Sequence, residues 1–229
     1  ANVPAAQPTP TPQPTVAFVA PVAVAAAPAA PAETPTPEPT APPANDYTGW
    51  IAFRSTRDGS EQIYVMRGDG SEQQLAPEDI RGRVDSLYQD ERRAPDGRTA
   101  FVQSPAGRSD ANISIASSDG VNISTLTDNN TDEYDPVWSR VGDRIAYVSN
   151  TTGNDEIWVI RADGTEQRQL TYNNWEWDKH PTWSPDGNQI AFFSNRSGQR
   201  QIWAMNSDGS GQRNLSSNVY DDWDPVWIK

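Results

Sequence analysis

The sequence Pro-Thr-Trp-Ser-Pro-Asp-Gly-Asn-Gln-Ile-Ala-Phe-Phe-Ser (residues 181–194), followed by Gln-Ile-Trp-Ala-Met-Asn-Ser-Asp-Gly (residues 201–209), decides the fold of this protein. It contains two short runs of β-branched and aromatic residues, and turns rich in Gly, Asp and Asn separate them. Such runs form antiparallel strands, and Asp-Gly supplies the positive φ angles of a tight hairpin. No helical periodicity of 3.6 residues is present. The stretch therefore predicts an antiparallel β unit.

The same pattern occurs four times after residue 48. The first run is expected to form strands at 50–54, 99–102, 144–148 and 189–193, and the second run at 62–66, 112–116, 156–160 and 201–205. A further strand precedes three repeats, at 134–139, 180–184 and 224–228. Four strands in about 45 residues, stacked on similar neighbours, are typical of a β-propeller blade. We therefore expect an all-β, four-bladed antiparallel β-propeller over residues 46–229.

These residues resemble the TolB-type propeller repeat, a distant relative of the WD repeat, over residues 48–229. The resemblance implies that the loop before each innermost strand faces a central channel. It also implies a periplasmic module that binds other proteins of the cell envelope. The sequence departs from the family pattern before the second repeat, where Glu91 and Arg93 replace Pro and Trp. This departure puts the innermost strand of that blade in question.

The repeats begin at 50–54 with the second strand of a blade, and they end at 224–228 with the first strand of a blade. The strand 224–228 can therefore complete the blade that 50–54 begins. A strand that joins the two ends of a propeller in this way prevents terminal fraying. We expect a closed ring of four blades; the alternative is a half-ring that pairs with a second copy of the chain.

The composition excludes several classes of function. The net charge is −13, and no basic stripe offsets it, so nucleic-acid binding is not expected. With no cysteine, disulfides and thiolate metal sites are absent, and we expect no cofactor. The apolar run at 15–27 contains Pro21 and is too short to span a bilayer. A Thr-Pro-rich start favours an extracellular or cell-surface location, with the periplasm as the alternative.

Catalysis is also not expected, so we predict that the protein is not an enzyme. No Gly-x-Ser-x-Gly motif is present, and 184 residues leave no room for a separate hydrolase domain beside the repeats. The only histidine, His180, precedes a proline at the entry of a strand. It is expected at the solvent edge of the channel mouth.

One set of carboxylates recurs with the repeat. Glu133, Asp178 and Asp222 lie near the proline of each innermost strand, and Asp135, His180 and Asp224 directly precede that proline. If these loops face the channel, Glu133, Asp178 and Asp222 are weak candidates for a metal site or for a basic group of a partner. The alternative is that each acid caps its own loop through backbone N–H groups.

Aromatic residues form a second recurrent set. The tryptophans at fixed blade positions are expected in the core: Trp138, Trp158, Trp183, Trp203 and Trp227. Four others lie in or beside the loops between blades: Tyr134, Trp175, Trp177 and Trp223. Loop aromatics at one end of a propeller are either packing lids or a partner-binding face. Both interpretations stay open at this point.

Residues 1–45 differ in composition from the repeats and are rich in Pro, Thr and Ala. Its Pro/Thr segments are expected to be extended spacers that can carry glycans on threonine. Between them, residues 16–25 are a candidate donor strand, with Val16, Phe18, Val22 and Val24 on one face and Val19 on the other. Docking of this arm on a neighbouring copy would give a head-to-tail extracellular filament, in which the partner is the chain itself. This filament is our first functional hypothesis, and the periplasmic protein-binding module is the alternative.

Overall fold

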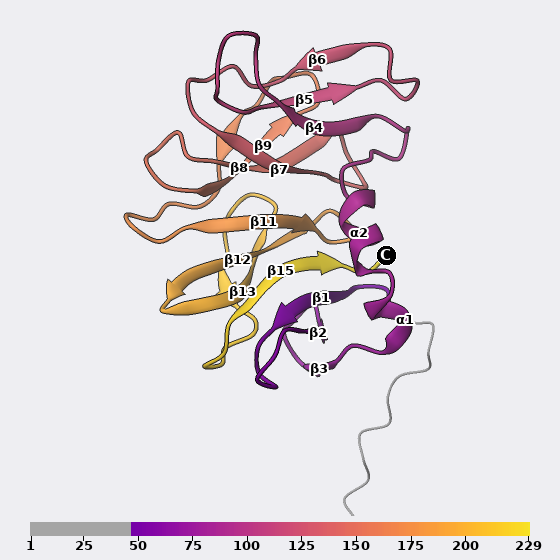
Figure 1. Cartoon of the computed structure of the whole chain (residues 1–229), viewed down its shortest axis with the longest axis vertical. Helices are drawn as coiled ribbons and strands as arrows, with labels where there is room; N and C mark the ends of the chain where they lie inside the picture. Colours follow the sequence, from indigo (N-terminus) through magenta and orange to yellow (C-terminus); the bar gives the residue numbers. More distant parts are fainter. Residues whose placement is uncertain (1–46) are drawn as a thin grey trace, which may run out of the picture. The chain divides into compact units, whose positions relative to one another are not determined.

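The computed structural model describes residues 47–229, in which strands dominate and form four antiparallel sheets (Figure 1). Sheet 1 has the order β15-β1-β2-β3, with strands Asp222–Trp227, Trp50–Ser55, Gln62–Arg67 and Gln74–Leu75. Sheet 2 has the order β4-β5-β6, with strands Thr99–Gln103, Asn112–Ala116 and Ile123–Thr125. Sheet 3 runs from β7 to β10, with strands Glu133–Trp138, Arg144–Ser149, Glu156–Arg161 and Arg168–Gln169. Sheet 4 runs from β11 to β14, with strands Asp178–Trp183, Gln189–Ser197, Gln199–Asn206 and Arg213–Asn214.

The strands expected from the repeat are all present in this part of the chain. The predicted joining of the two ends is confirmed, because β15 pairs antiparallel with β1 and places Trp227 opposite Ile51. Two short helices, α1 (Glu78–Arg81) and α2 (Val84–Asp90), connect sheet 1 to sheet 2. None of the helices between residues 47 and 229 is long and apolar enough to cross a membrane. The arm and its candidate donor strand, with Val16, Phe18, Val19, Val22 and Val24, lie outside the described residues.

The sheets stack in the order 1, 4, 3, 2, and three apolar clusters join them (Figure 1). Each cluster contains the tryptophan at the end of one innermost strand, namely Trp227, Trp183 or Trp138. Each of these tryptophans shares its cluster with smaller apolar residues of the next sheet, as Trp183 does with Ala146 and Val148. Full burial of one large apolar side chain contributes roughly 1.5–3 kcal/mol. These tryptophans are therefore core residues, as expected.

In residues 47–229, the face of sheet 1 that points away from sheet 4 is not covered by another sheet, as it would be in a closed ring. Its Ala52, Ile63 and Val65 pack against Ile80, Val84 and Leu87 of the helical connection, not against sheet 2. Sheet 2 has Ser114 and Ala116 where sheet 1 has the larger Tyr64 and Met66. The face of sheet 2 that points away from sheet 3 is therefore less apolar at these two positions, and Phe101 and Ile123 lie beside them on the same face. In the described residues, sheet-to-sheet packing thus closes three of the four interfaces of a ring, and helices cover the fourth.

Sheet 2 lacks a regular innermost strand, which agrees with the departure of its sequence from the repeat. Helix α2 and the residues after it occupy this place, and a single bridge joins Arg93 to Thr99. Glu91 stands where the other repeats have proline, and its side chain is 3% exposed. Its carbonyl accepts from the Trp138 N–H at 2.6 Å, while its carboxylate accepts from the Thr182 hydroxyl and lies 3.4 Å from the Lys229 ammonium. Glu91 therefore connects the second repeat to the other three.

Deletion of residues 223–229 should abolish the cooperative thermal transition of residues 47–229. Sheet 1 would lose its innermost strand, and the cluster between sheets 1 and 4 would lose Trp227. Circular dichroism in the near ultraviolet, followed with temperature, measures this loss. Deletion of residues 1–45 is the control and should leave the transition in place. A transition of unchanged cooperativity in the C-terminal deletion would contradict the joining role of β15.

Glu91→Gln should weaken the pH dependence of stability. Burial raises the pKa of Glu91 to about 7 from its ordinary value of 4.5. A carboxyl with a raised pKa in the folded state stabilises that state fully below pH 4.5, and this contribution is lost as the pH rises through 7. The shift corresponds to an upper limit of roughly 3 kcal/mol in the free energy of unfolding. Urea denaturation at pH 4.5, 6 and 8 should show a smaller decline in Glu91→Gln than in the wild type.

The control for this measurement is Glu166→Gln, which changes an acid that is 60% exposed. This variant should keep the slope of the wild type. Equal slopes in Glu91→Gln and Glu166→Gln would show that Glu91 does not titrate as its burial requires.

Candidate functional site

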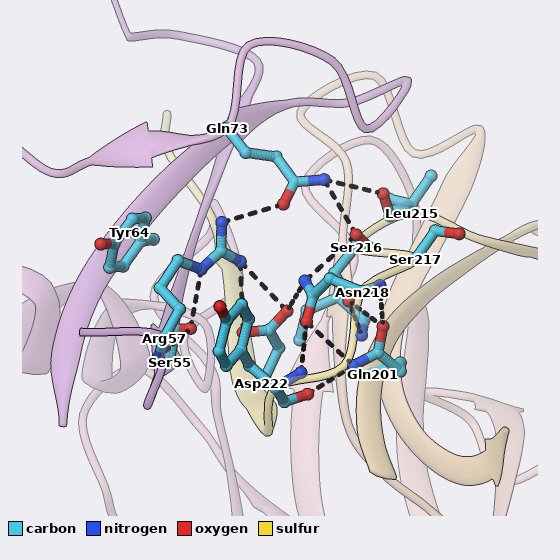
Figure 2. Close-up of polar contacts among 12 residues, drawn as sticks. Ser55, Arg57, Tyr64, Gln73, Gln201, Leu215, Ser216, Ser217, Asn218 and Asp222 are labelled. Atoms are coloured by element: carbon cyan, nitrogen blue, oxygen red, sulfur yellow. Dashed lines mark hydrogen bonds and ion pairs between the residues drawn. The ribbon is translucent and has the colours of Figure 1, made fainter. Parts of the chain in front are cut away.

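The candidate acid Asp222 lies in a buried polar network rather than at an open channel mouth (Figure 2). Its carboxylate oxygens lie 3.1 and 3.3 Å from the Arg57 guanidinium, and the Asn218 amide donates to one of them at 2.7 Å. Asp222 is directly opposite Ser55 in the pairing of β15 with β1, and Arg57 donates to both side chains. Its lone pairs are thus occupied by groups of the same protein.

Arg57 extends this network to the neighbouring sheet (Figure 2). Its guanidinium donates to Ser55 Oγ at 2.9 Å and to Gln73 Oε1 at 3.1 Å, and it lies over the Tyr64 ring. The Gln73 amide in turn donates to the carbonyl oxygens of Leu215 and Ser216, which follow sheet 4. The network therefore joins the outer parts of sheets 1 and 4 through groups that are only partly exposed.

Sheet 4 repeats the arrangement, and sheet 3 has a version without arginine. Asp178 pairs with Arg196 and accepts from the Asn173 amide at 2.9 Å, while Gln212 takes the place of Gln73. Glu133 accepts from the Asn129 amide and the Ser149 hydroxyl at 2.8 and 3.1 Å. All three acids are fully buried, each in its own sheet. The structure does not bring them together, and no group of three or more His, Asp or Glu residues in 47–229 could hold a metal ion.

The residues that converge on a common space are those directly before the prolines. Asp135, His180 and Asp224 have φ angles of 50°, 48° and 49°, in the left-handed region. Asp and His adopt this region more readily than most residues, which accounts for their recurrence here. Each lies at a β-bulge, where two residues of the innermost strand face one residue of the next strand. The bulge turns these side chains away from their own sheets.

We call this space the central pocket. Its volume is about 230 Å³. It lies where β7, β11 and β15 meet the end of α2, and it is lined by Arg54, Tyr88, Glu91, Arg92, Asp135, Val137, His180, Pro181, Asp224 and Pro225. Sequence analysis singled out the pre-proline positions, but nothing in the repeat indicated Arg54, Tyr88 or Arg92. These three come from a strand and a helical connection that only the tertiary structure places beside the innermost strands.

His180 lies between two carboxylates in the central pocket. Its Nε2 is 3.2 Å from Asp135 Oδ2, and its Nδ1 is 3.4 Å from Asp224 Oδ1. The Arg54 guanidinium is 3.5 Å from the other oxygen of Asp224, and the Tyr88 hydroxyl donates to the Asp224 carbonyl at 2.5 Å. Burial raises the pKa of Asp224, and the positive charges of His180 and Arg54 oppose that change. His180 is 40% exposed, which agrees with its expected position at the solvent edge, and it also joins three innermost strands.

The four aromatic candidates divide into one exposed residue and three that are partly buried. Trp175 is 88% exposed, and Tyr172 in the same loop is 73% exposed. Trp177 packs edge-on against Phe193, and the Lys179 ammonium lies over the rings of Trp177 and Tyr134. The Arg200 guanidinium lies 4.2 Å from the centre of the Trp223 ring. We call Tyr172 and Trp175 the aromatic face.

A buried carboxylate fixes the loop that carries the aromatic face. Glu156 accepts from the Thr171 hydroxyl at 2.5 Å, and from the Asn173 backbone N–H at 2.5 Å. The Asn173 amide donates to Glu156 and to Asp178. Burial raises the pKa of Glu156, and these hydrogen bonds oppose that change. Trp175 therefore projects from a loop whose backbone is held on both sides, a role of Glu156 that its repeat position alone did not indicate.

The family model for the TolB beta propeller domain matches residues 134–228. These residues are similar to the TolB-type propeller repeat. The match covers sheets 3 and 4 and the β15 strand of sheet 1, which contain all the residues of the aromatic face and most of the central pocket. No protein with a curated description matches the sequence.

Solved structures with a similar fold include TolB proteins and enzymes. A putative TolB from Agrobacterium tumefaciens is 17% identical over 79% of this chain and 71% of that chain, with a TM-score of 0.49. TolB from Acinetobacter baumannii is 14% identical over 78% of this chain and 54% of that chain, with a TM-score of 0.34. An oligogalacturonate lyase in complex with manganese is 14% identical over 72% of this chain and 61% of that chain, with a TM-score of 0.44.

Arg57→Ala should destabilise the protein by about 3–5 kcal/mol, because it leaves the buried Asp222 carboxylate without its cation. Arg144→Ala is the matched control, since Arg144 is 40% exposed and pairs with the exposed Glu166. Loss of such a surface pair costs about 0–1 kcal/mol. The double variant Arg57→Met with Asp222→Asn should recover part of the loss. Equal urea midpoints for the two alanine variants would contradict the structural role assigned to Asp222.

Proposed function

We propose that this protein is a protein-binding module of the cell envelope and that it binds its partner through the aromatic face. The observation that supports this proposal is Trp175, which is 88% exposed on a loop fixed by the buried Glu156. Tryptophan and tyrosine are enriched among the residues that contribute most to protein–protein binding. A fixed loop also loses little conformational entropy when a partner covers it. The TolB-type repeats of residues 134–228 support the same class of function and a periplasmic location.

The partly buried aromatics have a different role in this proposal. Trp177 and Trp223 contribute to the packing between sheets 1 and 4, and the cations over them restrict their rings. We expect them, with Tyr134, to support the shape of the face and to form its border. Of the two interpretations of the loop aromatics, a packing lid therefore fits Trp177 and Trp223, and a partner-binding face fits Trp175.

The filament hypothesis depends on the arm, outside the described residues. Strand addition requires a sheet edge with free backbone groups. The outer edge strands β3, β10 and β14 have two residues each, and β6 has three, so each gives an added strand few hydrogen bonds. We therefore rank the filament second. The prediction that the chain is not an enzyme stays a prediction.

The double variant Tyr172→Ala with Trp175→Ala should lose at least tenfold in affinity for the envelope protein that the wild-type chain binds. Two exposed aromatic anchors are removed, and residues of this kind often contribute 2 kcal/mol or more each. The partner is first identified by crosslinking to the full chain in an envelope extract, and the affinity is then measured with the purified partner. Val141→Ala, which shortens an exposed side chain in another turn, is the control.

Light scattering of the same samples separates the two functions. A monomeric full chain that binds its partner through Trp175 supports the binding module. Fibres that form with both the wild type and the double variant, and that disappear when residues 1–45 are deleted, would support the filament and contradict our proposal.

A further inference from the structure

In the central pocket, His180 lies between two carboxylates, Asp135 and Asp224, and a neutral His180 leaves one of them without a cation beside it. Asp224 has two partners, since the Arg54 guanidinium lies 3.5 Å and the His180 imidazole 3.4 Å from its oxygens. Asp135 has one ion-pair partner among the described residues, which is His180 at 3.2 Å. Asp135 Oδ2 is buried and accepts no hydrogen bond of good geometry. The Asp135 side chain is 24% exposed, and the imidazole is the one charged or potentially charged group that pairs with its buried Oδ2 among residues 47–229.

A neutral imidazole carries one N–H group and can donate to one of the two aspartates only. Since Arg54 already compensates Asp224, Asp135 is the carboxylate that lacks a positive charge when the imidazole is neutral. A buried or half-buried carboxylate without a cation or donor is costly. The pocket therefore favours a cation that enters beside Asp135.

The walls of the central pocket indicate which kind of cation fits. Val137, Tyr88, Pro181 and Pro225 also line the pocket and add apolar surface to it. The long methylene stems of lysine and arginine pack on such surfaces while their charged ends reach polar groups. A volume of about 230 Å³ suits one side chain, because pockets for whole small-molecule ligands measure roughly 300–1,000 Å³.

We propose that the central pocket receives a lysine or arginine side chain of the bound partner, with its charged group placed beside Asp135. The proposal rests on the proposed protein-binding function for the source of that side chain. The affinity of the pocket for the side chain itself does not depend on the aromatic face. A net charge of −13 favours the approach of a basic partner segment.

The single histidine permits a direct test by NMR. In the full chain without a polyhistidine tag, all imidazole signals come from His180. Titration at pH 8 with N-acetyl-lysine amide or N-acetyl-arginine amide should shift these signals in a saturable way. N-acetyl-norleucine amide has a similar stem without the charge and should cause no such shift. Equal shifts with the norleucine probe, or none with either basic probe, would overturn the proposal.

Two variants test whether the shift of the His180 signals comes from binding beside Asp135. Asp135→Asn should abolish the shift, and asparagine tolerates the left-handed backbone at this position. Asp119→Asn changes an exposed turn acid far along the chain and should respond as the wild type does. Retained binding in Asp135→Asn would overturn the assignment. Titration with calcium or potassium chloride is the third arm, and a shift with these salts but not with the basic probes would indicate a metal-ion site instead.

The double variant of the aromatic face separates this inference from the proposed function. It should lose the protein partner and keep the response of His180 to the lysine probe. Conversely, Asp135→Asn should keep the aromatic face and lose the probe. Failure of the probe titration alone would leave the aromatic face as the binding site and remove the basic side chain from the proposal.

Discussion

The burial of one tryptophan between each pair of adjacent sheets is the interaction on which the rest of the structure depends. Trp227, Trp183 and Trp138 end the three complete innermost strands, and each lies in an apolar cluster with small residues of the next sheet. A single blade of about 45 residues cannot cover both of its faces, so it is stable only between neighbours. The order of the sheets, the position of the innermost strands and the central pocket all follow from these contacts.

In the second repeat, where this tryptophan is missing, helices and a buried carboxylate make the contacts instead. The second repeat has Arg93 in place of the tryptophan, and its sheet presents Ser114 and Ala116 on the face away from sheet 3. Sheet 1 therefore buries its free face under α1 and α2. Glu91 then connects this helical segment to Trp138, Thr182 and Lys229. A buried carboxylate with a raised pKa is a costly connection, and it makes the stability of the stack sensitive to pH.

Acids and aromatics that recur in the sequence have divergent roles in the structure. Asp178 and Asp222 are neutralised inside their own sheets by Arg196 and Arg57, whereas Asp135 lines the central pocket. In the same way, Trp177 is packed and Trp175 is exposed, although only Glu176 separates them. In the function that we propose, recognition uses the positions that packing leaves free. Such positions can serve recognition because their loss does not open the core.

The sequence by itself determined the repeat, the strands, the turns and the joining of β15 to β1, because these depend on local periodicity and on turn residues. It also indicated that Glu91 and Arg93 disturb the second blade. The tertiary structure alone decided that helices cover the fourth face, because the size of side chains on two distant sheets sets that contact. It alone decided which acids face the central pocket, since a β-bulge before each proline reverses the direction that strand alternation would give to Asp135, His180 and Asp224. A bulge depends on the pairing of two strands, and no single strand carries that information.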